Sequence, residues 1–373
     1  MSEDFKRDQG RERAIAPGPR RGAVTVPSSK SIAHRELIAA ALSGVEPPLI
    51  RGESNDTRAT RACLKAMMAG EAVWPCGESG TTLRLLEPIA GVMGWKGAFR
   101  PEGRLAARPR LAFERKARYV IPGNVSSQFV SGLLMALPLA DWDSEIVIDG
   151  ALQGLDYVHL TEDVLRDAGI SFSFSDSPVQ AWRVPGGQRY RILGGREVEG
   201  DWSQAAFFLA MGVEVRGLRA DSRQGDRAAA RLMRELAGND GGERVISAAM
   251  IPDLVPALAA RAALRRGLVR FTDCARLRLK ESDRLESTAA LVNGAGGTAF
   301  LDGDTLVVRG DGRPLRGGKV RTFGDHRIAM AAAVLACGAA APVTVDDADV
   351  VAKSYPGFWD DFDALERQAP NLV

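Results

Sequence analysis

The sequence contains few of the residues that commonly bind metals or form disulfides. Its 373 residues include 3 histidines and 4 cysteines, and no two cysteines form a CxxC pair. Zinc sites and disulfide frameworks require such residues in pairs or clusters. We therefore expect no bound metal and no disulfide-based fold, and the cysteine usage is typical of a reducing, cytoplasmic compartment.

Several nucleotide-binding and nucleophile motifs are also missing. No GxxxxGK[ST] segment is present, which argues against a P-loop NTPase. No GxGxxG follows a strand-like run, which argues against a dinucleotide-dependent enzyme. The segment Gly77-Glu78-Ser79-Gly80 lacks the GxSxG spacing of a nucleophile elbow.

Long apolar runs and a strong charge imbalance are likewise absent. No run reaches the roughly 18 apolar residues of a transmembrane helix, and the polar N-terminus lacks the apolar stretch of a secretory signal. The formal net charge is +2 at pH 7, so the whole-chain field gives no reason to expect nucleic acid. We expect a cytoplasmic protein that binds neither membranes nor nucleic acid, and any anion site must come from local groups of cations.

Short strand-like runs alternate with segments rich in alanine and leucine that are long enough for helices. This alternation predicts an α/β or α+β architecture, and the length suggests two domains of roughly 150–200 residues each. Residues 1–22 have the composition of a flexible, charged tail. The predicted strands include Val24–Val26, Glu145–Ile148 and Thr305–Val308. The predicted helices include Ile32–Leu42, Phe129–Leu139, Ala205–Met211, Leu254–Leu264 and Ile328–Cys337.

Four helix-like segments begin with glycine or small polar residues, and three of these starts also carry cations. A cation in the first turn opposes the helix macrodipole by about 0.3–1 kcal/mol at an exposed site. It becomes favourable if an anion binds to the free backbone N–H groups there. N-capping by serine or aspartate explains any one start more simply, but four together indicate a ligand with phosphates and carboxylates. The starts are Pro27–Arg35, Cys76–Arg84, Gly123–Gln128 and Gly324–Arg327.

The densest group of charges is the segment Arg276–Leu285. If a helix begins at Ser282, Lys280 and Glu281 lie in the loop before it and Arg284 lies in its first turn. Such a Lys–Glu pair can donate and accept a proton, and the arginine can bind a carboxylate or phosphate through two N–H groups. From composition alone, a solvated helix start is the simpler explanation.

Two further charged residues have two interpretations each. Asp253 directly precedes an apolar segment, so it could cap a helix or orient a substrate hydroxyl and accept its proton. Lys353 lies near a late turn and indicates little when taken alone.

Eight segments of the chain resemble, in order, the motifs of EPSP synthases. They span residues 27–359, nearly the whole sequence. The segments are PSSKSIAHR, GESGTTLRLL, GNVSSQFVSGLLMALPL, GDWSQAAFFLA, IPDLVPALA, RLRLKESDRL, GDHRIAMAAAVLA and VAKSYPGFW.

The resemblance implies a fold and a division into domains. It implies an α/β protein, a two-domain inside-out barrel built of repeated βαβαββ units, with the ligand cleft between the domains. Residues 1–28 with 199–373 would form a discontinuous domain that carries the acid–base and clamp residues of the phosphoenolpyruvate side. Residues 29–198 would form the domain that carries the shikimate 3-phosphate ligands.

The resemblance also implies an activity. Members of the family transfer the enolpyruvyl (1-carboxyvinyl) group of phosphoenolpyruvate to the 5-hydroxyl of shikimate 3-phosphate and release phosphate. The reaction is an addition–elimination through a tetrahedral intermediate in chorismate and aromatic amino-acid biosynthesis. It requires an acid and a base but no metal or other cofactor. We expect these two small molecules as the partners of a monomeric transferase.

The matching motifs also imply the residues of the site, of which Lys30 contacts both substrates. The implied catalytic residues are Lys30, Asp253, Lys280, Glu281 and His326. The implied shikimate 3-phosphate ligands are Lys30, Ser31, Arg35, Ser126, Ser127, Gln128, Asp253 and Lys280. The implied phosphoenolpyruvate ligands are Lys30, Gly80, Arg108, Gln128, Arg284, Arg327 and Lys353.

The sequence departs from the family pattern at three places. Glu78 stands where many members have asparagine. The family's Ser-Lys-Pro-Tyr segment is Gly154-Leu155-Asp156-Tyr157 here, so one serine contact to the 3-phosphate is lost. The stretch between Asp56 and Gly77 is short, which predicts that one βαβαββ unit is trimmed.

Two alternatives to this activity remain. The related enolpyruvyl transferase that acts on UDP-N-acetylglucosamine uses a cysteine on a loop, whereas Glu102–Arg108 here has none. A non-catalytic, anion-binding relative would bind shikimate 3-phosphate without turnover. The inhibitor glyphosate occupies the phosphoenolpyruvate site in this family, and insensitive members often carry alanine at the position of Gly80. Glycine at this position predicts inhibition.

Overall fold

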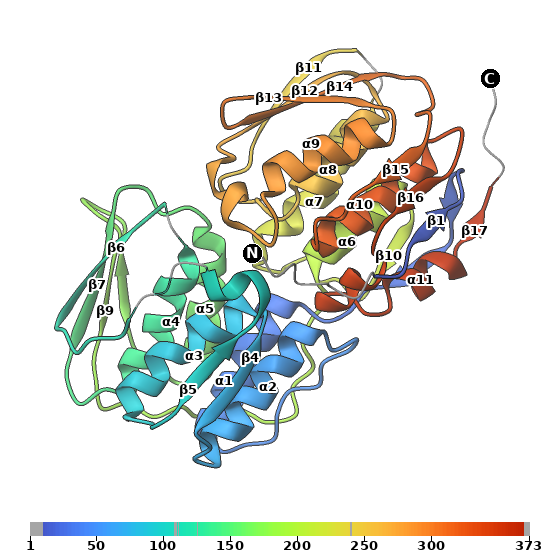
Figure 1. Ribbon diagram of the computed structural model, residues 1–373. Coiled ribbons are helices and arrows are strands. Elements are labelled where there is room, and N and C mark those ends of the chain that lie inside the picture. The colour runs from blue at the N-terminus through green and yellow to red at the C-terminus, as the bar shows by residue number, and fades with distance from the viewer. Residues whose placement is uncertain (1–9, 108–109, 111, 125, 239–240, 369–373) are drawn as a thin grey trace, which may run out of the picture. The chain divides into compact units, whose positions relative to one another are not determined.

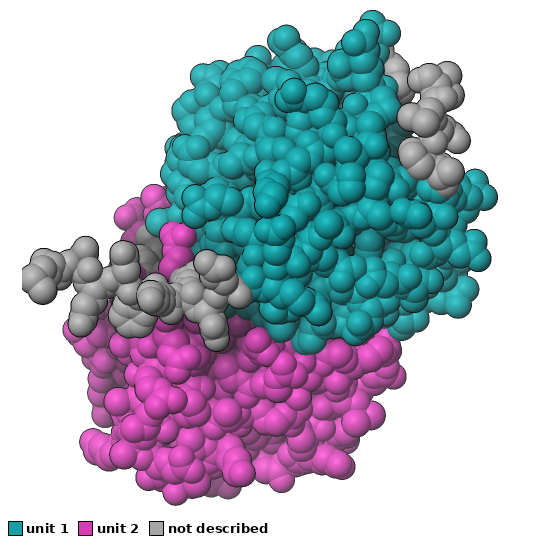
Figure 2. Space-filling view, turned by 45° about the vertical axis from the view of Figure 1, so that its right-hand side comes forward, with its two compact units in different colours: residues 1–26, 200–220, 226–373 teal, residues 27–199, 221–225 magenta. Residues whose placement is uncertain are grey.

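The protein is an α/β protein in the computed structural model (Figure 1), which describes residues 10–107, 110, 112–124, 126–238 and 241–368. Two compact units divide the chain (Figure 2). Unit 1 comprises residues 1–26, 200–220 and 226–373, and unit 2 comprises residues 27–199 and 221–225. The units change after residues 26 and 199, whereas the resemblance placed the domain changes after residues 28 and 198.

Unit 2 contains one complete βαβαββ repeat. Its first two strands are parallel, and its last two form an antiparallel hairpin whose second strand pairs with the second strand of the repeat. Alternate side chains of β6, such as Tyr119 and Ile121, are buried, as expected for a sheet with one covered face. The elements are β6 (Arg118–Pro122), α4 (Ser127–Ala136), β7 (Ser144–Asp149), α5 (Leu155–Asp167), β8 (Ser173–Ser175) and β9 (Ala181–Val184).

Unit 1 contains a second repeat with the same topology. The strand order β11-β12-β14-β13 matches β6-β7-β9-β8 of unit 2, with the same parallel and antiparallel pairings. The predicted βαβαββ construction is therefore confirmed. The elements are β11 (Glu243–Ser247), α8 (Val255–Ala263), β12 (Arg266–Thr272), α9 (Arg284–Gly294), β13 (Thr298–Asp302) and β14 (Thr305–Asp311).

The rest of unit 2 includes a shorter sheet. Strands β4 and β5 form a two-stranded parallel sheet, whereas each complete repeat has four strands. The short stretch after Asp56 predicted such a trimmed repeat. The elements are α1 (Lys30–Ser43), α2 (Asn55–Met68), β4 (Val73–Gly77), α3 (Gly80–Met93), β5 (Ala98–Pro101), and the short 3-10 helices η1 (Gly103–Ala107) and η2 (Leu137–Leu139).

The rest of unit 1 joins both ends of the described chain. Strand β1 is antiparallel to β16, β2 pairs with β17, and β3 is parallel to β10. The helices are α6 (Trp202–Met211), α7 (Ala229–Ala237), α10 (His326–Cys337), α11 (Phe358–Ala364), and the 3-10 helices η3 (Gly225–Ala228), η4 (Ala275–Leu279) and η5 (Asp349–Lys353). The strands are β1 (Arg13–Ile15), β2 (Arg20–Arg21), β3 (Ala23–Thr25), β10 (Glu214–Arg216), β15 (Gly318–Val320), β16 (Val343–Val345) and β17 (Glu366–Arg367).

The prediction of a flexible tail over residues 1–22 is wrong for its second half. Residues 13–15 pair with β16, and Ile15 is buried in the core of unit 1. Arg20 is also buried, and its guanidinium donates to the carbonyls of Ala16 and Gly18. The mixed charge gave no sign of this order, because Ile15 is the one residue of the described part of this segment that belongs to the hydrophobic core. The arginines Arg13 and Arg20 stack on the rings of Trp359 and Phe362. Residues 1–9 lie outside the described residues.

The predicted helices and strands are otherwise confirmed, with two changes at helix starts. Helix α9 begins at Arg284 and is capped by Asp283, so Ser282 does not start it. Helix α8 begins at Val255, and the carboxylate of Asp253 forms ion pairs in place of a cap.

Each unit has its own hydrophobic core with helices inside it. In unit 1, α10 packs against α6, α8 and α9 (Figure 1) and is buried along almost its whole length. A helix that is apolar on all sides is stable only when other elements surround it. In the described ranges, none of the helices is both long and apolar enough to cross a membrane.

Candidate active site

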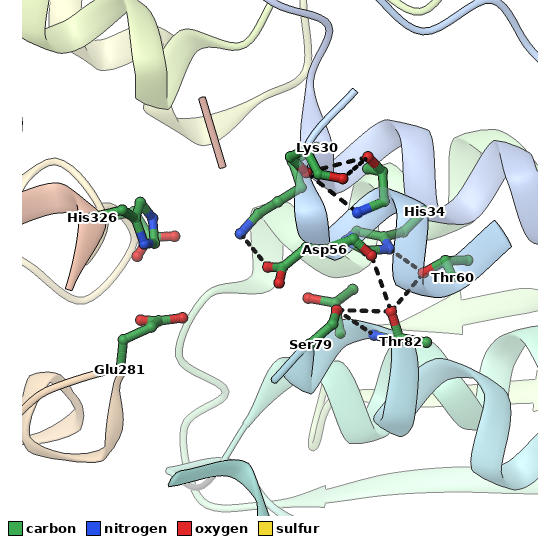
Figure 3. Close-up of polar contacts among 12 residues, drawn as sticks. Lys30, His34, Asp56, Thr60, Ser79, Thr82, Glu281 and His326 are labelled. Atoms are coloured by element: carbon green, nitrogen blue, oxygen red, sulfur yellow. Dashed lines mark hydrogen bonds and ion pairs between the residues drawn. The ribbon is translucent and has the colours of Figure 1, made fainter. Parts of the chain in front are cut away.

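In unit 2, the first turns of two helices are joined by an ion pair. Lys30, the first residue of α1, places its Nζ 2.9 Å from Oδ2 of Asp56 in the first turn of α2 (Figure 3). Both side chains are largely buried, at 15% and 7% exposure. A lysine at a helix N-terminus is unfavourable alone, whereas an aspartate there is favourable. The pair therefore holds a cation where the helix by itself would disfavour one.

Arg35 is a buried cation on the same helix. Its Nε donates to the hydroxyl of Thr161 at 2.7 Å, and its Nη2 donates to Ser131 and to the carbonyl of Tyr157. Its Nη1 donates to the carbonyl of Ser31 at 2.5 Å. Burial lowers the pKa of Arg35 to about 10. Arg35 joins α1 to α4 and α5, and its role as a carboxylate ligand stays a prediction.

The start of α4 presents the predicted phosphate ligands. Ser126 caps the helix by accepting from the backbone N–H of Gln128 at 3.3 Å, and Ser127 begins it. The amide of Gln128 accepts from Arg84 at 2.7 Å and donates to Thr81 at 2.8 Å. These contacts place Gln128 beside the first turn of α3, which begins at Gly80.

The missing serine of the family pattern has a local explanation. Gly154 caps α5 with φ +73° and ψ +37°, a left-handed conformation that glycine adopts more readily than serine. The chain turns sharply there into the helix that carries Tyr157. The carbonyl of Tyr157 accepts from Arg35, so this residue still contributes to the structure around the predicted site.

In unit 1, Asp253 is surrounded by cations. Its Oδ1 lies 3.3 Å from Nζ of Lys280 and 2.7 Å from Nη1 of Arg284, and its Oδ2 lies 3.3 Å from Nη2 of Arg327. Burial favours the neutral acid, but Arg327, Lys280 and Arg284 outweigh it and hold the pKa of Asp253 well below its usual range. Asp253 is therefore an ionised carboxylate at neutral pH.

The same cations are balanced by further carboxylates. Arg284 donates to Oδ2 of Asp325 at 2.9 Å and to the carboxylate of Glu281. Asp325 caps α10 and also accepts from the hydroxyl of Ser282 at 3.0 Å. Burial lowers the pKa of Lys280, and Asp253 opposes this shift. Lys280 is thus closer to releasing its proton than an ordinary lysine.

The remaining predicted residues vary in how far they join this group. His326 begins α10 and is buried, with its Nδ1 3.8 Å from the carboxylate of Asp325. Lys353 ends η5 and is partly buried. Arg108 lies outside the described residues. Within the ranges that the structure covers, no group of three or more His, Cys, Asp or Glu is placed to hold a metal ion.

Three aspartates beside the predicted residues were missed in the sequence. Asp56 and Asp325 both lie in helix starts whose caps could have drawn attention to them. Asp226 is buried and accepts from the hydroxyl of Ser203. Burial raises the pKa of Asp226 to about 7, Asp253 adds to the shift, and the Ser203 hydrogen bond opposes it. No local pattern around Asp226 indicates this placement.

The arrangement provides both proton-transfer groups and anion ligands. Unit 1 holds an ionised carboxylate, a second carboxylate and a lysine of lowered pKa around one buried arginine. Unit 2 holds a lysine and several helix N-termini with hydroxyl and amide side chains. Such groups can bind phosphates and carboxylates and can transfer protons.

Comparison with solved structures identifies enzymes with a similar fold. An EPSP synthase from Acinetobacter baumannii superposes with a TM-score of 0.71 at 20% identity, covering 96% of this chain and 100% of that one. The enolpyruvyl transferase NikO from Streptomyces tendae gives a TM-score of 0.65 at 16% identity, covering 96% and 98%. These likenesses confirm the expected two-domain inside-out α/β fold.

Sequence comparison gives the family. The model of the family described as EPSP synthase (3-phosphoshikimate 1-carboxyvinyltransferase) matches residues 110–362. A 3-phosphoshikimate 1-carboxyvinyltransferase from Clostridium kluyveri is 34% identical and aligns with 94% of this chain and 96% of its own length. One from Clostridium perfringens is 32% identical over 94% and 97%. The chain therefore belongs to the EPSP synthase family.

Proposed function

We propose that the protein transfers the enolpyruvyl group of phosphoenolpyruvate to the 5-hydroxyl of shikimate 3-phosphate and releases phosphate. Its family and the names of relatives that align over 94% of the chain support this activity. The product would serve chorismate and aromatic amino-acid biosynthesis. The single structural observation that carries the proposal is the group of charges around Arg284.

This group holds two carboxylates in different electrostatic settings. Asp253 contacts three cations, Lys280, Arg284 and Arg327, which keep it ionised. Glu281 contacts Arg284 from the preceding loop. Groups of this kind, held in different environments, are suited to act as base and acid in one reaction. Addition of a hydroxyl to the enol phosphate double bond of phosphoenolpyruvate requires both.

The first half of the proposed reaction is an addition. Asp253 orients the 5-hydroxyl of shikimate 3-phosphate. The hydroxyl proton passes to the Asp253–Lys280 pair as the hydroxyl oxygen bonds to C2 of phosphoenolpyruvate. Glu281 supplies a proton to C3, which becomes a methyl group. The two new bonds give a tetrahedral intermediate that carries the carboxylate, the phosphate and the shikimate oxygen on one carbon.

The second half is an elimination. A proton leaves C3 to the deprotonated Glu281, the C2–O bond to phosphate breaks with its electron pair, and the enol ether double bond forms. The pair Asp253–Lys280 returns its proton to the departing phosphate. Arg284 and Arg327 would hold the carboxylate of the enolpyruvyl group throughout, since arginine binds carboxylates through paired N–H groups. Fixed cations of this kind can supply much of the rate enhancement.

The predicted ligands of unit 2 suit the anionic acceptor. Ser126, Ser127 and Gln128 present hydroxyl and amide groups at the start of α4, where free backbone N–H groups favour a phosphate. Lys30 adds a cation at the start of α1. We assign these residues, with Ser31 and Arg35, to shikimate 3-phosphate, and we assign Gly80 and Lys353 to phosphoenolpyruvate.

A phosphate-release assay tests the proposal. Purified protein should release phosphate from phosphoenolpyruvate with shikimate 3-phosphate, and a chelator should not reduce the rate. UDP-N-acetylglucosamine in place of shikimate 3-phosphate should give no release. Release with the nucleotide sugar alone would assign the other transferase activity. Binding of shikimate 3-phosphate without release under any condition would assign a non-catalytic relative.

We further propose that the enzyme acts in the cytoplasm as a monomer and takes only small molecules as partners. The residues that would carry each step lie in one chain, and the four cysteines are typical of a reducing compartment. Light scattering coupled to gel filtration should give a mass near 39.9 kDa. A mass twice this value at micromolar concentration would contradict the monomer.

A further inference from the structure

A chain of buried polar side chains joins the first three helices of unit 2 (Figure 3). Nδ1 of His34 on α1 lies 2.6 Å from the hydroxyl of Thr60 on α2, which lies 2.6 Å from the hydroxyl of Thr82 on α3. The hydroxyl of Thr82 lies 2.7 Å from that of Ser79, the cap of α3. All four residues are at most 1% exposed.

The chain of contacts closes into a ring that includes Lys30, a predicted substrate ligand. The hydroxyl of Thr82 also lies 3.3 Å from the carbonyl of Asp56. The side chain of Asp56 pairs with Lys30, and Lys30 lies one helical turn before His34 on α1. The ring therefore passes through α1, α2 and α3, and each helix contributes at its N-terminal end.

The hydrogen bonds of the chain have one favourable direction. Burial lowers the pKa of His34 to about 3, Lys30 and Arg35 add to the shift, and Asp56 opposes it. The imidazole of His34 is therefore neutral near pH 7. Its Nε2 is buried with no hydrogen-bond partner among the described residues. An unpaired N–H inside a protein is rarer than an unpaired acceptor. The proton therefore belongs on Nδ1, which donates to the hydroxyl of Thr60. The hydroxyl of Thr60 then donates to that of Thr82, which donates to that of Ser79.

We propose that His34, Thr60 and Thr82 are positioning residues, which together set the place of Gly80 at the start of α3 relative to Lys30 at the start of α1. The proposal rests on the proposed function, because Gly80 is assigned there to phosphoenolpyruvate and Lys30 to shikimate 3-phosphate. None of the three residues is itself assigned to a substrate. They act through the two helix starts.

Directional contacts suit this role better than apolar packing would. Apolar side chains between helices tolerate small shifts, whereas hydrogen bonds weaken steeply when their length or angle changes. The buried Nε2 also lowers stability, because a buried polar atom without a partner costs free energy. An apolar residue at position 34 would avoid that loss, so the gain from His34 lies in geometry and not in stability.

The first test is kinetic. Thr60→Val keeps the side-chain shape but removes the hydroxyl, and it should lower kcat/KM for phosphoenolpyruvate about 10²-fold, as an ångström-scale misplacement can. The KM for phosphoenolpyruvate should rise more than that for shikimate 3-phosphate, since Gly80 belongs to the former. Thr60→Ser restores the hydroxyl and should keep kcat/KM within about threefold of wild type, far less than the loss from misplacement.

A packing variant separates positioning from general loss of stability. Ile89→Val removes one methylene from a buried residue in the second half of α3. It should lower the thermal midpoint without changing either KM. If Thr60→Val does not fold, Thr82→Val removes the next hydroxyl of the chain. Equal KM changes for both substrates, or a Thr60→Ser variant no better than Thr60→Val, would overturn the proposal.

The second test does not depend on turnover. The chain has 3 histidines, so ¹⁵N-histidine labelling gives few ring signals. At pH 7, the ring of His34 should be neutral with its proton on Nδ1, and the signal should be assigned with His34→Asn. A charged ring or a proton on Nε2 would overturn the proposal. If the wild type releases no phosphate, the proposed function fails, and the histidine signal still decides whether the chain runs from His34 to Ser79.

Discussion

Nη1 of Arg284 donates to Oδ1 of Asp253 across 2.7 Å. The arginine is fully buried and also donates to Asp325 and Glu281. Burial alone would lower the pKa of Arg284, but Asp325, Glu281 and Asp253 outweigh it and raise the pKa above its ordinary value. The cation is thus permanent, as its proposed role as a ligand of the substrate carboxylate requires.

Removing this arginine should destabilise unit 1. Arg284→Met leaves the buried carboxylate of Asp325 without its arginine partner and removes one of the three cations around Asp253. Breaking a buried ion pair in this way costs about 3–5 kcal/mol. Arg278→Met is the matched control, because Arg278 is 34% exposed and its ion pairs are worth at most about 1 kcal/mol. Urea unfolding, with hydrogen exchange of the α10 amides to report on unit 1, measures both. A loss no larger for Arg284→Met than for Arg278→Met would contradict this account.

The role of Glu281 predicts a kinetic effect with little effect on binding. Glu281→Gln keeps the side-chain shape but cannot supply a proton, so kcat should fall by about 10²–10⁴-fold while both KM values change little. Glu286→Gln is the control, since Glu286 lies exposed in the first turn of α9, the helix that follows Glu281. It should retain wild-type kcat. A loss of less than about threefold in Glu281→Gln, well below the range for a catalytic acid, would make Glu281 a bystander.

The α/β class was predictable from the sequence because its signals are local, whereas the repeated βαβαββ architecture was implied by the resemblance to the EPSP synthase family. Apolar segments such as Ile328–Cys337 and strand-like runs such as Thr305–Val308 have clear composition, and the ordered motifs supply the family. The site residues near Asp253 and Lys280 could be named for the same reason. What could not be predicted are contacts between distant segments. The burial of Asp226 against Ser203 and the link from His34 to Thr60 depend on packing that no short pattern encodes.

The sequence left two uses open for Asp253 and was misleading for residues 13–15. Asp253 fits the composition of a helix cap, yet α8 begins two residues later and the carboxylate pairs with cations from α9 and α10. Residues 13–15 have the composition of a tail, yet they pair with β16. In both cases a long-range partner decides the structure.

A buried carboxyl in unit 2 predicts how stability depends on pH. Burial raises the pKa of Glu36 on α1 to about 7, Asp167 and Glu199 add to the shift, and Arg196 opposes it. The folded state therefore keeps a proton that the unfolded state loses near pH 4.5. Stability falls as pH rises from about 4.5 to 7, and the loss is complete above pH 7, where it amounts to about 1–3 kcal/mol.

Glu36→Gln tests this dependence. The amide cannot ionise, so the variant should lose less free energy of unfolding between pH 5 and pH 8 than the wild type does. Glu46→Gln is the control, because Glu46 is exposed, and its pH dependence should match the wild type. Urea unfolding at several pH values measures all three proteins. Parallel curves for Glu36→Gln and wild type would show that Glu36 titrates normally.

Inhibition by glyphosate is expected because Gly80 begins α3. The inhibitor carries a phosphonate and a carboxylate, and the cations assigned to phosphoenolpyruvate would bind them. Glyphosate should therefore compete with phosphoenolpyruvate. Gly80→Ala adds a methyl group at the helix start, and one methylene changes discrimination by about 10–200-fold. The inhibition constant should rise by an amount in this range, while the KM for phosphoenolpyruvate rises less because the substrate is smaller.

Glu78 provides the second variant of this experiment. It lies two residues before Gly80, and a Cβ placed on Gly103 would collide with its carboxylate. Its negative charge should disfavour an anionic inhibitor, so Glu78→Asn, which introduces the residue of many family members, should lower the inhibition constant. Glyphosate titrations at fixed phosphoenolpyruvate compare wild type with both variants. No inhibition of the wild type at concentrations far above that of phosphoenolpyruvate, or an unchanged constant in Gly80→Ala, would show that Gly80 does not admit the inhibitor to this site.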